Sequence, residues 1–181
     1  NFYIQNTGIT FLNRLLEIDI FSLFFVCLCF LFIINGSNLI DGYNGLLGIH
    51  SLIILINLFF INLMGKNWDL SFFIFSSIVI IGTFLKYNFP KANVFLGDGG
   101  AYFLGSFIAI TTIMTSKAYP EISPFYFCIL LFYLFFEVFF SFVRKIYQKK
   151  SPILPDNKHL HMLSFIKISE IFGANKGNYI N

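Results

Sequence analysis

Long uncharged runs alternate with short polar segments along this chain. Five runs carry no charge, apart from one glutamate in the last, and they cover residues 20–40, 42–65, 70–85, 99–116 and 122–143. A helix needs about 20 apolar residues to cross the hydrocarbon layer, and these runs lack the alternation of barrel strands. The third run is short and must borrow flanking residues. The pattern predicts an all-α, polytopic membrane helical bundle with about five transmembrane helices, forming a single membrane domain over residues 1–181.

Composition identifies the surroundings of these helices. Hydrophobic residues make up 57% of the 181 residues and charged residues 12%, and the mean hydropathy is +0.77. Typical globular proteins have about half and about a quarter, respectively. A soluble fold of this size cannot hide so much apolar surface, so the lipid bilayer is the expected partner. The composition excludes a free nucleic-acid binder and a disordered chain. It leaves the oligomeric state open, and a homo-oligomer is compatible with it.

Alternation of the helices assigns each polar segment to one side of the membrane. One side carries seven Lys and Arg, in residues 35–45, 86–100 and 144–161. The other side carries three, in residues 1–19, 65–69 and 116–124. The positive-inside rule places the first group in the cytoplasm. We therefore expect a multi-pass protein of the bacterial inner membrane whose candidate chemistry, in the loops at about 35–46, 86–100 and 144–162, faces the cytoplasm.

The first polar cluster contains Asn38, Asp41 and Asn44. Their spacing of three places them on one face of a helix, and Gly42 and Gly45 end that helix and let a ligand approach the backbone. Carboxylate and amide oxygens beside bare backbone suit a sugar nucleotide or a hydrated Mg²⁺. A helix cap explains any one of these residues, but a cluster at a membrane interface favours a site.

The second cluster contains Asn88, Phe95 and Asp98, with glycines on both sides of Asp98. A helix that begins with glycines presents free N–H groups to a phosphate, while Asp98 holds the metal that bridges it. The alternative is an ordinary Asp-Gly turn. A carboxylate at the entrance of an apolar helix is costly without a compensating cation, which favours the site.

The third cluster contains His159 and His161, preceded by basic residues that include Lys158. Such a loop collects anions and suits a diphosphate or anionic headgroups. Zinc is disfavoured because no third ligand is near the two histidines in the sequence. Glu137, inside the last apolar run, is either a functional acid or a structural partner of Arg144 two helical turns away.

In their order and sidedness, the three clusters resemble the polyprenyl-phosphate N-acetylhexosamine-1-phosphate transferases. The matching patterns are NxxNxxDGxxGL at residues 35–46, NxP…FxGDxG…LG at residues 88–105 and PDxxHxH at residues 155–161. Members include the translocase of peptidoglycan synthesis and the enzymes that initiate O-antigen. The resemblance implies transfer of sugar 1-phosphate from a UDP-N-acetylhexosamine to undecaprenyl phosphate, with release of UMP and a requirement for Mg²⁺.

The resemblance also implies roles for individual residues. Asp98 would bind Mg²⁺ on the diphosphate, with Asp41 at the same nucleotide and metal site. His159 and His161 would contact the diphosphate or the sugar. The expected catalytic residues are therefore Asp41, Asp98, His159 and His161, and the expected substrate-binding residues, including Phe95 stacked on uracil, are Asn38, Gly42, Asn44, Asn88, Phe95 and Lys158.

Three departures from the family pattern qualify this expectation. Asn44 stands where the family has a second aspartate, and Met162 where it usually has a third histidine. The sequence contains no adjacent aspartate pair, which the family carries on an upstream loop. We therefore expect the C-terminal part of a longer transferase. The alternatives are a non-catalytic, truncated membrane protein of the same fold and a small transporter, which is disfavoured because the polar groups gather at helix ends on one side.

Overall fold

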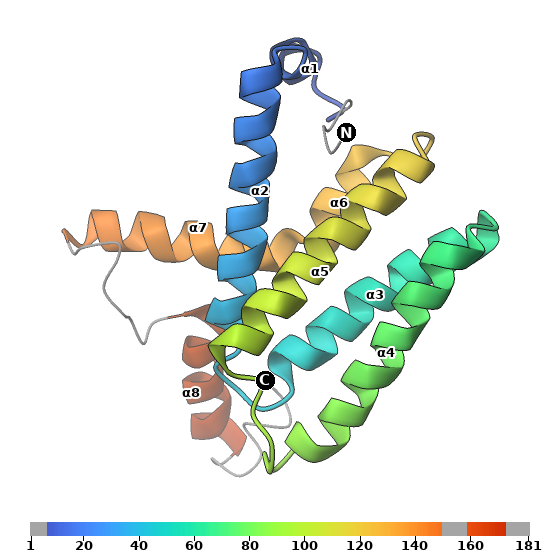
Figure 1. Cartoon of the computed structure of the whole chain (residues 1–181). Helices are drawn as coiled ribbons and strands as arrows, with labels where there is room; N and C mark the ends of the chain where they lie inside the picture. The colour runs from blue at the N-terminus through green and yellow to red at the C-terminus, as the bar shows by residue number, and fades with distance from the viewer. Residues whose placement is uncertain (1–6, 150–158, 173–181) are drawn as a thin grey trace.

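A computed structural model describes residues 7–149 and 159–172 of the chain. Every regular element in these two ranges is a helix (Figure 1). The helices are α1 Thr10–Leu16, α2 Asp19–Ile40, α3 Leu46–Met64, α4 Trp68–Asn88, α5 Gly97–Ala118, α6 Pro124–Leu130, α7 Phe132–Tyr147 and α8 Leu160–Phe172. The predicted all-α class is confirmed.

Four of these helices, α2 to α5, are long and apolar enough to cross a membrane. They coincide with the first four predicted spans, and α4 has gained flanking residues at both ends, as its short apolar run required. The second span begins at Leu46 rather than at residue 42, because Gly45 takes a left-handed conformation with φ of 81° and separates the turn from the helix. The chain is therefore a multi-pass membrane protein.

The fifth apolar run does not form the single straight helix that its composition predicts. It divides into α6 and α7, which meet at Leu131 with a bend of 65°, and the span count is five only if this pair counts as one. In Figure 1, α7 crosses α2 at a steep angle. Gly36 of α2 lies against the backbone carbonyl of Leu134 near the start of α7. Because glycine has no side chain, the two helices approach more closely here than any larger residue would permit.

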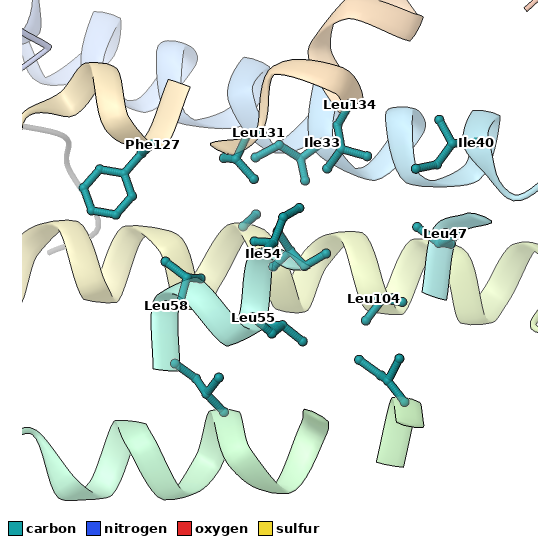
Figure 2. Close-up of a cluster of buried hydrophobic side chains, with 14 of the residues drawn as sticks. Ile33, Ile40, Leu47, Ile54, Leu55, Leu58, Leu104, Phe127, Leu131 and Leu134 are labelled. Carbon is teal, nitrogen blue, oxygen red and sulfur yellow. The ribbon is translucent and has the colours of Figure 1, made fainter. Parts of the chain in front are cut away.

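The helices pack chiefly in three pairs, α3 with α4, α2 with α5, and α2 with α7. Their contact is apolar, and Figure 2 shows side chains from α2, α3, α5 and the α6–α7 region meeting in one cluster. Labelled members of the cluster are Ile33, Ile40, Leu47, Ile54, Leu55, Leu58, Leu104, Phe127, Leu131 and Leu134. Many other large apolar side chains, such as Phe72 and Phe103, are exposed on the outer faces, where lipid is the natural solvent.

The two ends of the bundle differ as the alternation of spans predicts. At one end the α3–α4 turn meets the end of α5, since Gly65 contacts the Tyr119 ring and the Tyr119 hydroxyl donates to the carbonyl of Asn62 over 3.4 Å. The polar segments between α2 and α3 and between α4 and α5 contact each other at the opposite end. This second end carries the predicted site.

Candidate functional site

The turn between α2 and α3 forms the centre of the site. Helix α2 ends at Ile40, and Asp41 closes it by donating its backbone N–H to the carbonyl of Asn38 over 3.3 Å. Gly45 then starts α3 from its left-handed conformation. Residues 41–45, which we call the first-motif turn, therefore project from the ends of two membrane helices.

Hydrogen bonds join this turn to the segment between α4 and α5. The buried amide of Asn88 accepts from the backbone N–H of Gly45 over 2.6 Å and donates to the carbonyl of Val94 over 2.8 Å. The side chain of Asn44 donates to the carbonyl of Pro90 over 3.1 Å. Because the bonds of Gly45 and Asn44 join segments more than forty residues apart, they hold the first and second motifs in one register.

The same junction brings two carboxylates into electrostatic contact. Asp41 is half-buried, and its burial, followed by the negative charge of Asp98, raises its pKa from 3.8 to about 6. Asp98 lies exposed in the first turn of α5. One turn further on, the hydroxyl of Tyr102 accepts a 3.2 Å hydrogen bond from the Asn38 side chain, which ties α5 to the end of α2.

Two neighbouring carboxylates fit a hydrated divalent cation. Mg²⁺ is commonly bound by one or two carboxylates together with substrate phosphates and water. A positive ion would offset both the burial of Asp41 and its smaller repulsion from Asp98, which together raise the pKa of Asp41. Within the ranges that the structure covers, no group of three or more His, Cys, Asp or Glu is arranged to hold a metal. The donor set therefore suits a cation that takes its remaining ligands from a substrate.

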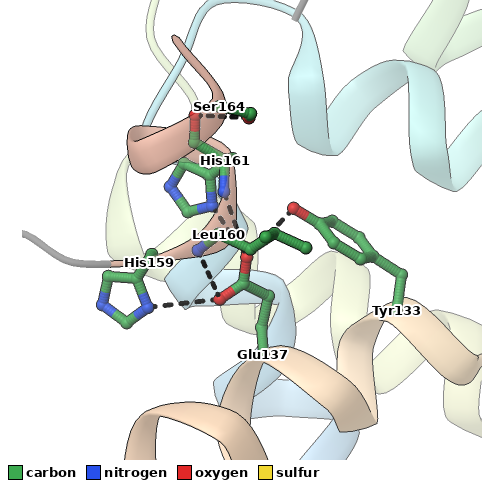
Figure 3. Close-up of polar contacts among 6 residues, drawn as sticks. All are labelled: Tyr133, Glu137, His159, Leu160, His161 and Ser164. Atoms are coloured by element: carbon green, nitrogen blue, oxygen red, sulfur yellow. Dashed lines mark hydrogen bonds and ion pairs between the residues drawn. The ribbon is translucent and has the colours of Figure 1, made fainter. Parts of the chain in front are cut away.

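The histidines of the third motif meet Glu137 of α7 (Figure 3). His159 Nδ1 lies 3.3 Å from Oε2 of the carboxylate and His161 Nδ1 lies 3.1 Å from Oε1. The Tyr133 hydroxyl donates to Oε1 over 3.0 Å. The two imidazoles are nearly parallel, with ring centres 5.6 Å apart. Helix α7 thus anchors the third motif through Glu137.

The third motif also contacts the first-motif turn. A Cβ added to Gly42 would lie 2.9 Å from Nε2 of His161, so the imidazole packs against bare backbone beside Asp41. The Tyr43 ring meets His161 edge-on at 5.6 Å and stacks on Phe165 of α8 at 4.8 Å. Burial raises the pKa of the Tyr43 hydroxyl above its usual value. The first-motif turn therefore contacts both other motifs.

Eight of the ten predicted site residues gather at this junction. They are Asn38, Asp41, Gly42, Asn44, Asn88, Asp98, His159 and His161. Phe95 stands on the same α4–α5 segment with 74% of its surface exposed, and Lys158 lies outside the described residues. Asn88 already has both ends of its amide bound to backbone. The ligand contacts assigned to all ten residues stay predictions.

Two features of the site were not anticipated from the sequence. Tyr102 carries no motif signal, although its place four residues after Asp98 puts it on the same side of α5. Glu137 stands out in the sequence as an intramembrane acid, but the spacing there suggests Arg144 as its structural partner. The carboxylate instead binds Tyr133 and the two histidines, while the guanidinium of Arg144 lies 5.3 Å from the centre of the Phe140 ring.

Comparison with known proteins finds relatives that match the part of the chain that forms this site. The family model described as glycosyl transferase family 4 matches residues 1–116. An undecaprenyl-phosphate alpha-N-acetylglucosaminyl 1-phosphate transferase of Thermotoga maritima is 34% identical over 165 residues, covering 91% of this chain and 50% of the relative. A probable undecaprenyl-phosphate N-acetylglucosaminyl 1-phosphate transferase of Bacillus subtilis is 36% identical over 135 residues, covering 71% of this chain and 36% of the relative.

A second kind of relative matches a shorter stretch. A phospho-N-acetylmuramoyl-pentapeptide-transferase of Caldicellulosiruptor bescii is 36% identical over 89 residues, covering 48% of this chain and 27% of the relative. No solved structure matches the chain significantly. The chain spans half of the Thermotoga relative and less of the others. The match of the family model over residues 1–116, more than half of the sequence, shows that the chain belongs to glycosyl transferase family 4.

Proposed function

We propose that this chain is part of a membrane phosphotransferase that moves N-acetylhexosamine 1-phosphate from a UDP-sugar to undecaprenyl phosphate, releases UMP and initiates a cell-envelope glycan, either O-antigen or peptidoglycan. The observation that carries the proposal is the meeting of three motifs at the first-motif turn, where Asp41 is coupled to Asp98 and His161 packs on Gly42. The names of the relatives support the same chemistry.

The reaction explains why such a site needs carboxylates that can hold a cation. An oxygen of the lipid phosphate attacks the sugar-linked phosphorus of the diphosphate, the bond from that phosphorus to the bridging oxygen breaks, and UMP leaves with the electron pair. Two anions must approach each other, so the site has to stabilise negative charge. Mg²⁺ held by Asp98 and Asp41 would supply that stabilisation when bound.

The remaining residues of the proposed site bind and orient. Asn38 and Asn44, whose amides donate to the Tyr102 hydroxyl and the Pro90 carbonyl, would contact the nucleotide beside the carboxylates. The exposed ring of Phe95 offers a stacking surface for uracil. His159 and His161, which are buried beside the first-motif turn, would hydrogen-bond the diphosphate or the sugar, and the basic residues that include Lys158 would attract the anionic substrates.

The proposed location follows from the acceptor. Undecaprenyl phosphate is anchored in the bilayer, so its phosphate is reached at a membrane interface, which is where the ends of α2 and α5 place Asp41 and Asp98. The excess of Lys and Arg in the segments at this end orients it toward the cytoplasm of a bacterial inner membrane.

An assay of UMP release tests the proposal. The protein, with whatever further residues its gene encodes, is purified in nanodiscs and supplied with undecaprenyl phosphate, Mg²⁺ and a UDP-sugar donor. UDP-N-acetylglucosamine and UDP-N-acetylmuramoyl-pentapeptide, tested in parallel, also define the sugar. We expect UMP release that needs donor, lipid phosphate and Mg²⁺ together. A folded protein that releases none with either donor would be a non-catalytic member of the family.

A further inference from the structure

We propose that Glu137 is a positioning residue that holds His159 and His161 with Nδ1 protonated, so that in both imidazoles Nε2 is the ring nitrogen turned away from the carboxylate. This inference rests on the proposed function for the identity of the substrate, a nucleoside diphosphate sugar, but the arrangement of the three side chains is independent of it.

The contacts of Glu137 are unusually complete for an acid in an apolar helix. The carboxylate has no exposed surface, and groups from two elements surround it (Figure 3). Oε1 receives the Tyr133 hydroxyl at 3.0 Å, His161 Nδ1 at 3.1 Å and the His161 backbone N–H at 3.4 Å. Oε2 receives His159 Nδ1 at 3.3 Å and the Leu160 backbone N–H at 3.4 Å. A buried carboxylate is costly unless it is hydrogen-bonded, and five contacts offset that cost.

The chemistry of these partners determines where the imidazole protons lie. An ionised carboxylate only accepts hydrogen bonds, so each Nδ1 that faces it carries a proton. In a neutral imidazole the lone pair then lies on Nε2. Nε2 of His161 is also the ring atom nearest to the Cβ position of Gly42, at 2.9 Å, which directs this edge toward the first-motif turn. Glu137 therefore determines the tautomer, and it turns Nε2 of the buried His161 toward Gly42 in the first-motif turn.

A purely structural role for Glu137 is the competing explanation. The two backbone N–H groups that it accepts belong to Leu160 and His161, the first residues of α8, so the carboxylate also caps that helix. Capping of α8 needs only an oxygen that accepts from the backbone N–H groups. Positioning needs, in addition, an oxygen that accepts from Nδ1 of each imidazole. Glu137→Gln separates the two roles, because an amide keeps one acceptor oxygen for the backbone but turns a donor NH₂ toward one histidine. That histidine must then accept at Nδ1 and carry its proton on Nε2.

Nitrogen-15 NMR of histidine-labelled protein in nanodiscs reads the tautomers directly. The chain has three histidines, so the single variants His159→Asn and His161→Asn assign the signals. In the unaltered protein we expect both site histidines to carry a proton on Nδ1. In Glu137→Gln at least one should change to the Nε2-protonated form. Glu170→Gln, a matched change on the exposed side of α8, should leave both signals unchanged.

Kinetics then separate this inference from the proposed function. We expect Glu137→Gln to lower kcat for UMP release about 10- to 100-fold, the usual effect of losing a carboxylate that orients a functional histidine. KM for the UDP-sugar should change by less than about threefold. Glu137→Asp should recover part of the loss. Tyr133→Phe, which removes a donor without touching either imidazole, should cost less than Glu137→Gln.

The outcomes distinguish the two claims. Nε2-protonated site histidines in the unaltered protein would overturn the positioning role, even if UMP is released at a high rate, and this measurement needs no variant to fold. The positioning role would also be refuted if Glu137→Gln left the tautomers of both histidines unchanged. Nδ1-protonated histidines that respond to Glu137→Gln, in a protein that releases no UMP, would support the positioning role while refuting the proposed reaction.

Discussion

The backbone N–H of Gly45 donates a 2.6 Å hydrogen bond to the side chain of Asn88, although 43 residues separate them. Gly45 begins α3 and Asn88 ends α4, so the bond closes the α3–α4 hairpin at the site end. The amide of Asn88 continues to the carbonyl of Val94, which shapes the segment leading to Asp98. One buried side chain therefore sets the distance between the two motifs that carry the carboxylates.

Replacing Asn88 with alanine should loosen this junction. The change leaves the Gly45 N–H and the Val94 carbonyl without their partner, and a buried polar group left unpaired costs about 1–3 kcal/mol. Unfolding in detergent, followed by heat or denaturant, measures the loss. Asn93→Ala is the matched control, because that side chain is exposed on the same segment and should change stability by less than about 0.5 kcal/mol. Equal stabilities of the two variants would contradict the linking role of Asn88.

Asp98→Asn should abolish turnover. The carboxylate is the proposed ligand of Mg²⁺ on the diphosphate, and an amide keeps its size but loses the charge that holds the cation. We expect UMP release to fall at least about a hundredfold, whereas Asp69→Asn at the opposite end of the bundle should leave the rate unchanged. Rates in Asp98→Asn equal to those of the unaltered protein would refute the metal assignment.

The same substitution should lower the pKa of Asp41. Burial is the larger cause of its rise to about 6 and the charge of Asp98 the smaller, so the pKa in Asp98→Asn should fall but stay above 3.8. Since the folded protein holds this proton more tightly than the unfolded chain, Asp41 reduces stability as the pH rises from about 4 to about 6. Carbon-13 NMR of labelled aspartate across that pH range measures the shift. An unchanged Asp41 pKa in Asp98→Asn would show that the two carboxylates are not coupled.

The sequence predicts four of the membrane helices well because charges and glycines mark their ends. Asp19, Asp69 and Lys117 lie within or next to the ends of helices whose apolar interiors carry no charge. The bend at Leu131 has no such marker, since residues 125–143 contain neither Pro nor Gly. Its position depends on the close approach of Gly36 on another helix, which a pattern along one helix does not record.

The sequence likewise predicts one part of the site and not the other. Alternation of spans predicts that the three motifs share one end of the bundle, because it depends only on the number of crossings. It does not predict the rotation of a helix about its axis, and that rotation decides which side chains meet. The contacts of Glu137 with the histidines, 22 and 24 residues away, and of Asn38 with Tyr102 therefore required the structure.

The opposite end of the bundle offers a test of stability that should leave the site intact. The fully buried Asn62 of α3 donates to the Thr115 hydroxyl of α5 over 2.8 Å. Thr115→Val keeps the shape but removes this interhelical bond, and we expect a loss of about 1 kcal/mol with UMP release unchanged. Thr83→Val is the control, because the exposed Thr83 bonds only within α4, to the carbonyl of Val79. Unfolding in detergent that finds equal losses would assign the effect to the hydroxyl itself rather than to the contact between helices.

Gly36 should be the position where a single added methyl group does most harm to the arrangement of α7. Its Cβ would collide with the backbone carbonyl of Leu134, and a backbone atom cannot move aside by changing rotamer. Gly36→Ala should therefore push α7 away from α2 and cost about 1–3 kcal/mol of stability. Gly82→Ala is the matched control, since nothing lies within 4 Å of a Cβ there and alanine favours a helix by about 0.5–1 kcal/mol.

The two glycine variants also connect the fold to the site. Glu137 follows Leu134 by one helical turn, so a displacement of α7 moves the carboxylate that holds both histidines. Gly36→Ala should lower UMP release as well as stability, and it should disturb the histidine NMR signals that Gly82→Ala leaves unchanged. If Gly36→Ala is as stable as Gly82→Ala, then α2 and α7 do not pack as closely as described. A loss of stability with unaltered histidine signals would mean instead that α7 yields at its bend without moving Glu137.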